Sequence, residues 1–468
     1  MDHPKRVAIP HSSTTPLART FATFARRLDF KDLPSSAIHA TKRHLIDALG
    51  CAYGALDDDA PVISERLARR VRSEPGAHTL YGSHTSPDIA AFVNGVLIRY
   101  LDYNDTYLSL EPAHPSDNIA ATLAAAELAH ATGPEFITAT IAAYEIQCRL
   151  ADAASIRAQG WDHVCYGAFS TACGAGRLLG LTEEQLVHAQ AISAGPHMAM
   201  RQTRSGELSM WKGTAFANTA RNGVMATLLA ADGMTGPAPL FEGEFGFFAQ
   251  VAGRPFTVAP LGGPDGLAVE RTLHKYWPAE YHAQSAIEAA LTLRDDLGSH
   301  AAIDRIRIDS SDAAVDIIGS GEERWRPSTR ETADHSLPYC TAIAFIDGEV
   351  GPAQFVDARI SDPLVLDVVS RVDVRRNDAL TARYPESTSN RVTVMTTDGR
   401  EISHQVDYPK GHVRNPLSDE ELLSKFYRQA EPQIPRRRLD KLVDSLWQLD
   451  AVEDMSQLLP AMIRLGSE

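Results

Sequence analysis

The sequence has few cysteines and no long apolar run. The five cysteines are widely spaced, and no two form a C-x-x-C pair: Cys51, Cys148, Cys165, Cys173 and Cys340. Zinc ribbons, iron–sulfur centres and disulfide frameworks need closely placed thiols, so we expect none of them and expect a reducing compartment, the cytoplasm. No run of about eighteen apolar residues occurs, and residues 1–16 lack the apolar core of a signal peptide. We therefore expect no membrane span and no secretion signal.

Short motifs of several common enzyme classes are also missing. The chain has no H-E-x-x-H, no G-x-S-x-G, no P-loop sequence and no strand-linked G-x-G-x-x-G. Each of these motifs places the groups that one kind of chemistry requires. The sequence therefore gives no support to a metalloprotease, a serine hydrolase, a kinase or a nicotinamide-dependent enzyme.

The sequence has fewer basic than acidic residues. The chain has 45 Lys and Arg against 60 Asp and Glu, a formal net charge of -15. An acidic surface repels phosphate backbones, so we expect no nucleic-acid partner. The same field repels anionic substrates, so an anion would need a local basic pocket. Clusters of Arg, Lys and His are therefore the informative features of this sequence.

The length of 468 residues exceeds one ordinary core and predicts at least two domains. Alanine-rich segments at 120–131, 139–154 and 214–231 predict closely packed helices. After about residue 273 the pattern changes: Ile306 and Ile308 alternate with charged residues, and a hairpin is expected around the Asp398-Gly399 turn. Helices are expected between these strands, at 283–297 and 339–347.

Helical patterns return near the C-terminus. Ser418 and Glu421 form a capping box ahead of a new helix, and leucines from Leu439 to Leu449 follow at helical spacing. We expect this segment to pack back on the first domain. The α+β part would then be an insertion, and the cleft between the two parts would be a natural active site.

The segment 101–118, LDYNDTYLSLEPAHPSDN, is the first candidate for chemistry. It carries Asp102, Thr106 and His114 just before an alanine-rich helix, whose N-terminus favours a carboxylate. For Ser116 and Asp117 the simpler interpretation is helix capping. For the other three residues together, a functional role is favoured.

The segment 198–213, MAMRQTRSGELSMWKG, is the second. Arg201 and Arg204 are able to clamp carboxylates through paired hydrogen bonds. Lys212 falls in the first turn of the next helix, where a cation opposes the helix dipole, so it is a candidate ligand for a substrate. A surface lysine bending into solvent explains Lys212 equally well.

Four further segments carry isolated polar groups. They are GWDHVCYGAF with His163, KYWPAEYHAQ with His282, RETADHSLPY with Asp334, His335, Ser336 and Tyr339, and YPKGHVRN with Lys410, His412 and Arg414. A packed histidine, a hydrogen-bonded turn ahead of a helix and a solvated basic loop are the alternative interpretations of the last three.

With these segments, the chain resembles the MmgE/PrpD family, which includes 2-methylcitrate dehydratases and cis-aconitate decarboxylases. The resemblance covers nearly the whole chain and is strongest in LDYNDTY with HPSDN, RQTRSGELSMWKG, RETADHSLPY and YPKGH. It implies a mainly α fold, with a helical domain at 1–273 completed by 415–468 and a smaller α+β lid domain at 274–414. It also implies a homodimer that works without metal or organic cofactor.

The resemblance also implies site residues. By position in the motifs, the active-site residues of the family correspond to Asp102, Thr106, His114, His163, Lys212, His282 and Tyr339. We further expect substrate to be bound by Arg201, Gln202, Arg204, Asp117, Ser336 and Lys410.

HPSDN and DHSLPY resemble the dehydratase branch more than the decarboxylase branch. We therefore expect a hydro-lyase that dehydrates a small polycarboxylate, 2-methylcitrate. The hypothesis assigns proton transfers to Asp102, His114 and His282, without deciding which is base and which is acid. Decarboxylation of cis-aconitate and epimerisation of a dicarboxylate remain alternatives. In a further alternative the helical bundle is a binding module, and no pocket gathers these side chains.

Overall fold

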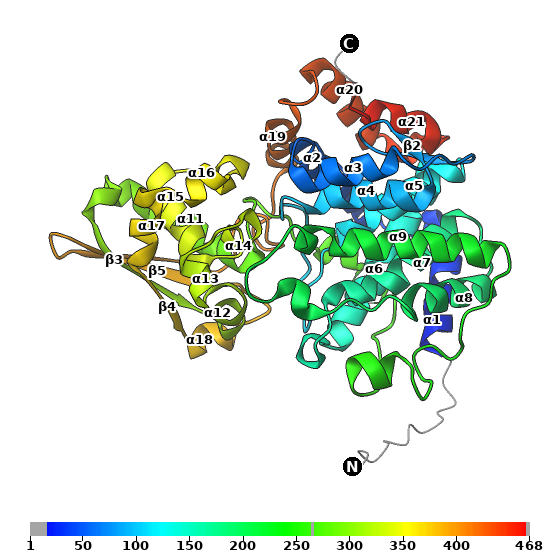
Figure 1. Cartoon of the computed structure of the whole chain (residues 1–468), viewed down its shortest axis with the longest axis horizontal. Helices are drawn as coiled ribbons and strands as arrows, with labels where there is room; N and C mark the ends of the chain where they lie inside the picture. The colour runs from blue at the N-terminus through cyan, green and yellow to red at the C-terminus, as the bar shows by residue number, and fades with distance from the viewer. Residues whose placement is uncertain (1–15, 264–265, 465–468) are drawn as a thin grey trace.

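The computed structural model describes residues 16–263 and 266–464. Figure 1 shows two lobes side by side, one built of long helices and one built around a sheet. We call residues 16–276 with 407–464 the helical lobe, and residues 277–406 the sheet lobe. The stretch at 1–15, where the absence of a signal sequence was expected, lies outside the described residues.

The helical lobe contains helices from both ends of the chain. They are α1 (Leu17–Arg27), α2 (Ser35–Gly54), α3 (Asp59–Ala68), α4 (Pro87–Arg99), α5 (Ile119–Leu128), α6 (Gly133–Ala153), α7 (Gly167–Leu178), α8 (Glu183–Ala194), α9 (Trp211–Ala231), α10 (Ala268–Arg271), α19 (Asp419–Ala430), α20 (Arg436–Trp447) and α21 (Met455–Met462). A short ribbon of β1 (Ala77–His78) and β2 (His84–Thr85) lies at its edge.

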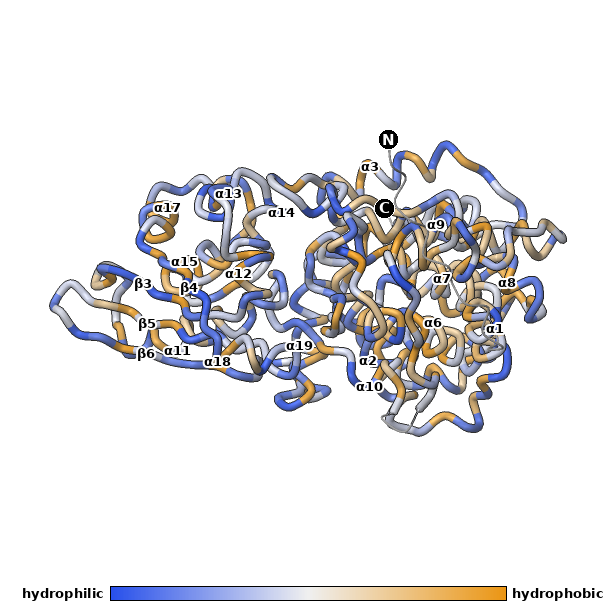
Figure 2. Tube along the Cα trace, turned by 90° about the horizontal axis from the view of Figure 1, so that it is seen from below, coloured by the Kyte–Doolittle hydropathy of each residue, from blue (hydrophilic) through white to orange (hydrophobic). Residues whose placement is uncertain are grey.

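Small residues bring these helices close together, as the alanine-rich segments predicted. A Cβ added to Gly95 of α4 would lie 3.0 Å from Ala217 of α9, and one added to Gly223 of α9 would lie 2.7 Å from Thr171 of α7. Any larger side chain at these two positions would force the helices apart. In Figure 2, hydrophobic residues follow α6 and α7 through the interior of the lobe.

The sheet lobe has a four-stranded sheet in the order β4-β3-β5-β6. Its strands are β3 (Ile303–Ser310), β4 (Val372–Arg376), β5 (Asn390–Thr396) and β6 (Glu401–Val406). β3 pairs with β4 in parallel and with β5 antiparallel, and β5 and β6 form the expected hairpin. Gly399 in the turn has φ +85°, a conformation that favours glycine.

Helices cover this sheet and fill the lobe. They are α11 (Gln284–Leu297), α12 (Asp312–Ile318), α13 (Glu322–Trp325), α14 (Arg330–Ala333), α15 (Leu337–Asp347), α16 (Asp357–Ile360), α17 (Pro363–Ser370) and α18 (Asp378–Thr381). α11 and α15 correspond to the two helices expected here. The hydrophobic core of the lobe runs from Trp277 to Val406 and is separate from the cores of the helical lobe. The prediction of a mainly α fold with a smaller α+β part is confirmed, whereas the domain limits near 273 and 414 stay a prediction.

The C-terminal helices return to the helical lobe. One core contains residues between Leu33 and Tyr144 together with residues between Leu417 and Met462. Figure 1 shows α19 beside α2. Buried between them, the Nζ of Lys425 lies 2.7 Å from Oδ1 of Asp47. A buried ion pair of this kind fixes how the returning segment sits on α2.

Two further findings bear on the sequence predictions. Within the described part of the chain, no helix has both the length and the apolarity to cross a membrane. All five cysteines are buried and unpaired.

Candidate active site

A cavity of about 290 Å³ lies where the two lobes meet. This size suits a small metabolite. Its lining from the helical lobe includes Arg99, Thr106, Glu111, His114, Arg157, Asp162, His163, Arg201 and Arg204. Its lining from the sheet lobe includes Glu280, Ser320, Glu323, Arg324 and His335. Five arginines line the cavity beside five carboxylates, Asp316 included, so the lining has both cations for an anionic substrate and acidic groups that partly neutralise them.

Asp102 lies directly behind this lining, at the end of α4. It is fully buried and has φ 51°, an unusual value for a residue other than glycine. Its carboxylate accepts a hydrogen bond from Arg99 and lies 3.0 Å from Nζ of Lys275 and 3.6 Å from Nζ of Lys212. Lys275 also donates to the backbone oxygen of Asp102 at 2.8 Å. These contacts hold the strained residue in place.

The surrounding cations determine the charge of Asp102. Burial opposes ionisation, but Arg99, Lys212 and Lys275 outweigh it and hold the pKa of Asp102 well below its usual range. Burial lowers the pKa of Lys212, against the attraction of Asp102 and Asp334. Asp102 is consequently a carboxylate in a compact cluster of opposite charges.

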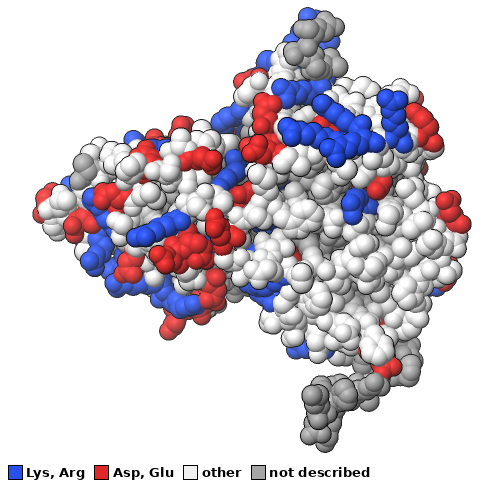
Figure 3. Space-filling model, in the orientation of Figure 1, with Lys and Arg blue, Asp and Glu red and all other residues white. Residues whose placement is uncertain are grey.

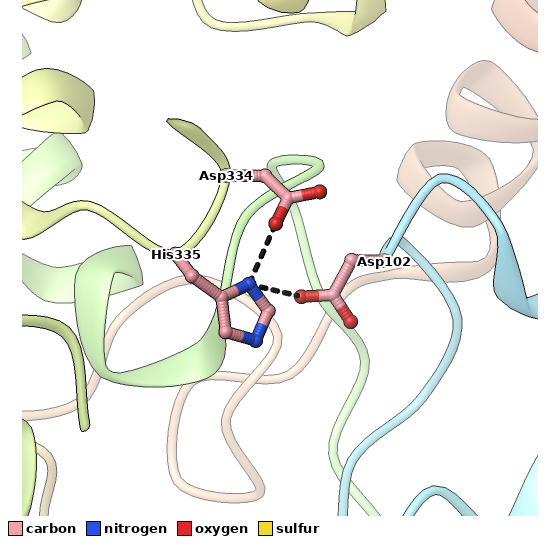
Figure 4. A group of neighbouring side chains, drawn as sticks. All are labelled: Asp102, Asp334 and His335. Carbon is pink, nitrogen blue, oxygen red and sulfur yellow. Dashed lines mark hydrogen bonds and ion pairs between the residues drawn. The ribbon is translucent and has the colours of Figure 1, made fainter. Parts of the chain in front are cut away.

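Asp102, Asp334 and His335 are close enough together to hold a metal ion. Figure 4 shows both carboxylates directed at Nδ1 of His335, at 2.6 Å for Asp334 and 3.8 Å for Asp102. The Nζ of Lys212 lies within 3.6 Å of both carboxylates. A divalent cation on these oxygens would lie beside that ammonium group, and like charges at such distances repel strongly in a buried site. The donor set therefore fits an ion-pair cluster better than a metal site.

Two histidine rings form one side of the cavity. The Nδ1 of His114 lies 2.6 Å from the backbone oxygen of Asp105 and 3.3 Å from Oγ1 of Thr106. The Nδ1 of His163 lies 3.1 Å from Oδ1 of Asp162. The ring centroids of His114 and His163 are 5.8 Å apart. Because a carbonyl oxygen only accepts, Nδ1 carries the hydrogen in the ring of His114 and Nε2 keeps its lone pair.

Both rings are neutral. Burial, followed by Arg99 and Lys275, lowers the pKa of His114 well below its usual value. Burial, followed by Arg204, lowers the pKa of His163 to about 3. A neutral imidazole with a free Nε2 is able to act as a proton acceptor.

The same arrangement occurs on the side of the sheet lobe. The Nδ1 of His282 lies 2.9 Å from Glu280, and the Nδ1 of His335 lies 2.6 Å from Asp334. Burial, followed by Lys212, lowers the pKa of His335 to about 4. Carboxylates thus orient both rings.

The structure brings most of the expected catalytic residues together, with two of the expected substrate-binding arginines. Thr106, His114, His163, Arg201 and Arg204 line the cavity. Asp102 and Lys212 lie behind it, and His282 contacts the lining residue Glu280. Lys212 is 1% exposed, so the alternative of a surface lysine is wrong.

Other expected residues lie elsewhere. The hydroxyl of Tyr339 donates to the backbone oxygen of Gln354 within the sheet lobe, and Ser336 caps α15 by accepting from the Tyr339 amide. Lys410 pairs with Glu421 at 2.7 Å. Gln202 is exposed on the turn between the two arginines. The functional roles expected of these four residues stay predictions.

The expected capping by Ser116 or Asp117 is wrong for the described chain. Ser116 donates to Oδ1 of Asp105 through both its amide and its hydroxyl, and α5 has no side-chain cap. Asp117 accepts from Asn104 and lies 3.8 Å from Arg99. These residues therefore shape the loop that holds His114.

Several cavity residues were not expected from the sequence. They are Arg99, Arg157, Glu280 and Arg324 in the lining, with Lys275 behind it. Lys275 and Glu280 lie in the KYWPAEYHAQ segment, of which only His282 was singled out, and Arg324 stands in a charged stretch. Only the fold brings them to the motif residues, so spacing along the chain carried no signal.

The fold and cavity thus define a two-lobed, mainly helical protein with a cavity lined by arginines, histidines and carboxylates between its lobes. Residues 19–258 match the MmgE/PrpD N-terminal domain, and residues 277–449 match the MmgE/PrpD C-terminal domain. The chain belongs to the MmgE/PrpD family.

Named relatives are similar over most of their length. The chain is 30% identical over 434 residues to 2-methylcitrate dehydratase of Escherichia coli (strain K12), covering 86% of this chain and 87% of the relative. It is 30% identical over 430 residues to 2-methylcitrate dehydratase of Cupriavidus necator, covering 85% and 86%. It is 29% identical over 427 residues to a probable 2-methylcitrate dehydratase of Saccharomyces cerevisiae, covering 84% and 82%.

Proposed function

We propose that the protein is a hydro-lyase that dehydrates 2-methylcitrate to 2-methyl-cis-aconitate. The observation that carries the proposal is the cavity itself, in which the neutral rings of His114 and His163 stand among arginines and the Nε2 of His114 is left to accept a proton. Such a site holds a polycarboxylate and accepts a proton from a carbon beside a carboxylate. The similarity to 2-methylcitrate dehydratases supports this choice of substrate.

His114 is the proposed base. Its Nε2 takes the proton, the C–H electron pair forms the double bond, and the neighbouring C–O bond breaks. The imidazolium then returns the proton to the departing hydroxide, and water leaves. Every atom is accounted for without a second acid. Thr106 and His163, which lie beside the ring, orient the substrate.

Asp102 has a different role in this proposal. A carboxylate held ionised by Arg99, Lys212 and Lys275 is a weak base, because its pKa lies well below its usual range. It instead holds the cluster that fixes Asp334 and, through it, the ring of His335. Lys212 binds both carboxylates and is the centre of that cluster.

Arginines of the helical lobe bind the carboxylates of the substrate. Arg157 lies 3.3 Å from Glu111, and Arg204 donates to Asp162 at 2.9 Å, so both are partly neutralised within the protein. Arg201 lines the cavity without an ion pair to any described residue, which leaves its guanidinium for the substrate.

A direct test uses purified protein treated with EDTA and mixed separately with 2-methylcitrate, citrate and cis-aconitate. Products are followed by NMR. We expect 2-methyl-cis-aconitate to form without added metal. Itaconate from cis-aconitate would instead indicate the decarboxylase activity. Loss of turnover on EDTA treatment, restored by a metal, would contradict the ion-pair interpretation of the Asp102 cluster.

We also propose a cytoplasmic homodimer. In Figure 3 the face of the helical lobe over α7, α8 and α9 carries few charges. Large exposed apolar side chains lie along and just before α9, namely Met210, Trp211 and Met225. A face with few charges and with exposed apolar side chains suits contact with a second copy of the chain. Five unpaired cysteines fit a reducing compartment.

A further inference from the structure

Arg324 is a buried cation at the cavity wall that has no ion-pair partner among the described residues. It belongs to α13 of the sheet lobe, is 5% exposed and lines the cavity. Its Nε and Nη1 atoms are buried and make no hydrogen bond to any described residue. Native proteins rarely leave buried donors unpaired, so an unmade contact at a cavity wall points to a ligand.

The backbone of Arg324 is fixed while its side chain is left free. The hydroxyl of Ser336 donates to the Arg324 backbone oxygen, and the Arg324 amide donates to Gly321 at 3.1 Å. The neighbouring Trp325 donates from Nε1 to the backbone oxygen of Val372 at 3.0 Å. The position of Arg324 is therefore set by α15 and β4, without using its guanidinium.

The charge of Arg324 is only partly compensated. Burial lowers the pKa of Arg324, opposed by the more distant charges of Glu323, Asp334 and Glu280. No carboxylate of the described chain lies within ion-pair distance of it, whereas Arg99 and Arg204 each hydrogen-bond one. A buried cation without a counterion is costly, and an anionic ligand would offset that cost.

We propose that Arg324 binds one carboxylate of the substrate from the sheet lobe, while the arginines of the helical lobe bind the others. This inference rests on the proposed function and deepens it. Nε and one Nη of a guanidinium form a fork that matches the two oxygens of a carboxylate. The substrate then spans both lobes, and Arg324 selects ligands with three carboxylates over ligands with two.

The test measures binding of tricarballylate, which has three carboxylates and no hydroxyl to lose, and of glutarate, which has two. Isothermal titration calorimetry compares the wild type with Arg324→Met, Arg324→Lys and the matched control Arg326→Met. Arg326 lies two residues away with its side chain 81% exposed. The melting temperature of each variant is recorded first.

We expect Arg324→Met to weaken tricarballylate binding by about 10- to 100-fold, the range for a charge-assisted contact, and to change glutarate binding little. Arg324→Lys keeps the charge without the fork and should recover part of the loss, which also serves if Arg324→Met does not fold. Arg326→Met should bind as the wild type does. Equal tricarballylate affinity in the wild type and both Arg324 variants would overturn the proposal.

The same proteins separate this inference from the proposed function. If the wild type dehydrates 2-methylcitrate and the Arg324 variants keep its tricarballylate affinity, the proposed reaction is supported and the role of Arg324 is contradicted. If the variants lose affinity but the wild type does not dehydrate 2-methylcitrate, the role of Arg324 in binding is supported and the proposed reaction is contradicted. A wild type that dehydrates 2-methylcitrate but does not bind tricarballylate overturns the inference about Arg324 and leaves the proposed reaction unaffected.

Discussion

The Nδ1 atom of His114 donates to the backbone oxygen of Asp105 across 2.6 Å. Asp105 is in turn held by Ser116 and by the hydroxyl of Tyr144, which donates to its Oδ2 at 2.8 Å. The ring of His114 is thereby fixed in one tautomer and one orientation, with Nε2 left to accept a proton. The orientation of the proposed base is thus set by a contact with the backbone. This contact does not depend on the protonation of the neighbouring side chains.

Replacing His114 by Gln should remove the base while leaving the pocket of similar size. Because a positioned base typically contributes about 10²–10⁴-fold, kcat for 2-methylcitrate should fall by that range. KM should change little, since the arginines remain. Steady-state kinetics check this, with His404→Gln on β6 as the control. A variant with wild-type kcat would remove His114 from the mechanism.

Replacing Lys212 by Met should lower both the free energy of unfolding and the catalytic activity. Lys212 lies between the buried carboxylates of Asp102 and Asp334, so its loss leaves two negative charges facing each other. Breaking a buried pair typically costs about 3 kcal/mol or more. Urea unfolding should show this loss, whereas Lys441→Met on the surface of α20 should not.

A second substitution tests the cause of that loss. Adding Asp334→Asn to Lys212→Met removes one of the two facing charges, so part of the unfolding free energy should return. If the double variant is less stable than Lys212→Met alone, charge repulsion is not the reason for the instability.

Stability should fall as the pH is lowered through the range in which free histidine titrates. His335 has its pKa lowered by burial to about 4, whereas in the unfolded chain it titrates near 6.5. Between these two values the unfolded state binds more protons, so acid favours unfolding, by about 1 kcal/mol per pH unit for one histidine. Urea unfolding at pH 7.5 and 5.0 measures the slope.

The variant His335→Gln isolates this contribution. Asp117, whose pKa is raised to about 7 by burial, acts with the opposite sign but is present in both proteins and cancels in the comparison. The variant should lose less stability between the two pH values than the wild type. Parallel pH dependences would mean that His335 is not held neutral in the folded protein.

A new charge on the face over α7, α8 and α9 should break the proposed dimer. Met225 is exposed on α9, and Met225→Glu would bury a carboxylate in an apolar contact. Light scattering after size-exclusion chromatography should give a dimer for the wild type and a monomer for the variant. Leu364→Glu, on exposed α17 of the sheet lobe, should remain dimeric. A dimeric Met225→Glu protein would place the interface elsewhere.

Much of the fold was predictable because local patterns agreed with it. Alanine-rich helices, the hairpin at Asp398-Gly399 and the capping box at Ser418 all appear where they were expected. The parallel strand β4 was not predicted, although Val372 and Val374 alternate with charged residues in VDVRR. Five residues are a short signal, and the pairing with β3 that places the strand is not visible in the strand itself.

The residues of the candidate site were likewise predicted only in part. Motifs pointed to Thr106, His114, His163 and Arg201, which line one cavity. They also pointed to Tyr339, whose hydroxyl is used inside the sheet lobe. Arg324 stands in a charged stretch that is typical of a solvated surface. What distinguishes it is burial without a partner, a property of three-dimensional structure alone.

The return of the C-terminal segment to the helical lobe has a consequence for biosynthesis. Leu422 and Phe426 of α19 join a core whose members between Leu33 and Tyr144 were synthesised several hundred residues earlier. On the ribosome, the sheet lobe emerges as one continuous segment and is able to fold first. The helical lobe keeps an open apolar face on α2 until translation ends, so a chain released early would expose that face to chaperones and proteases.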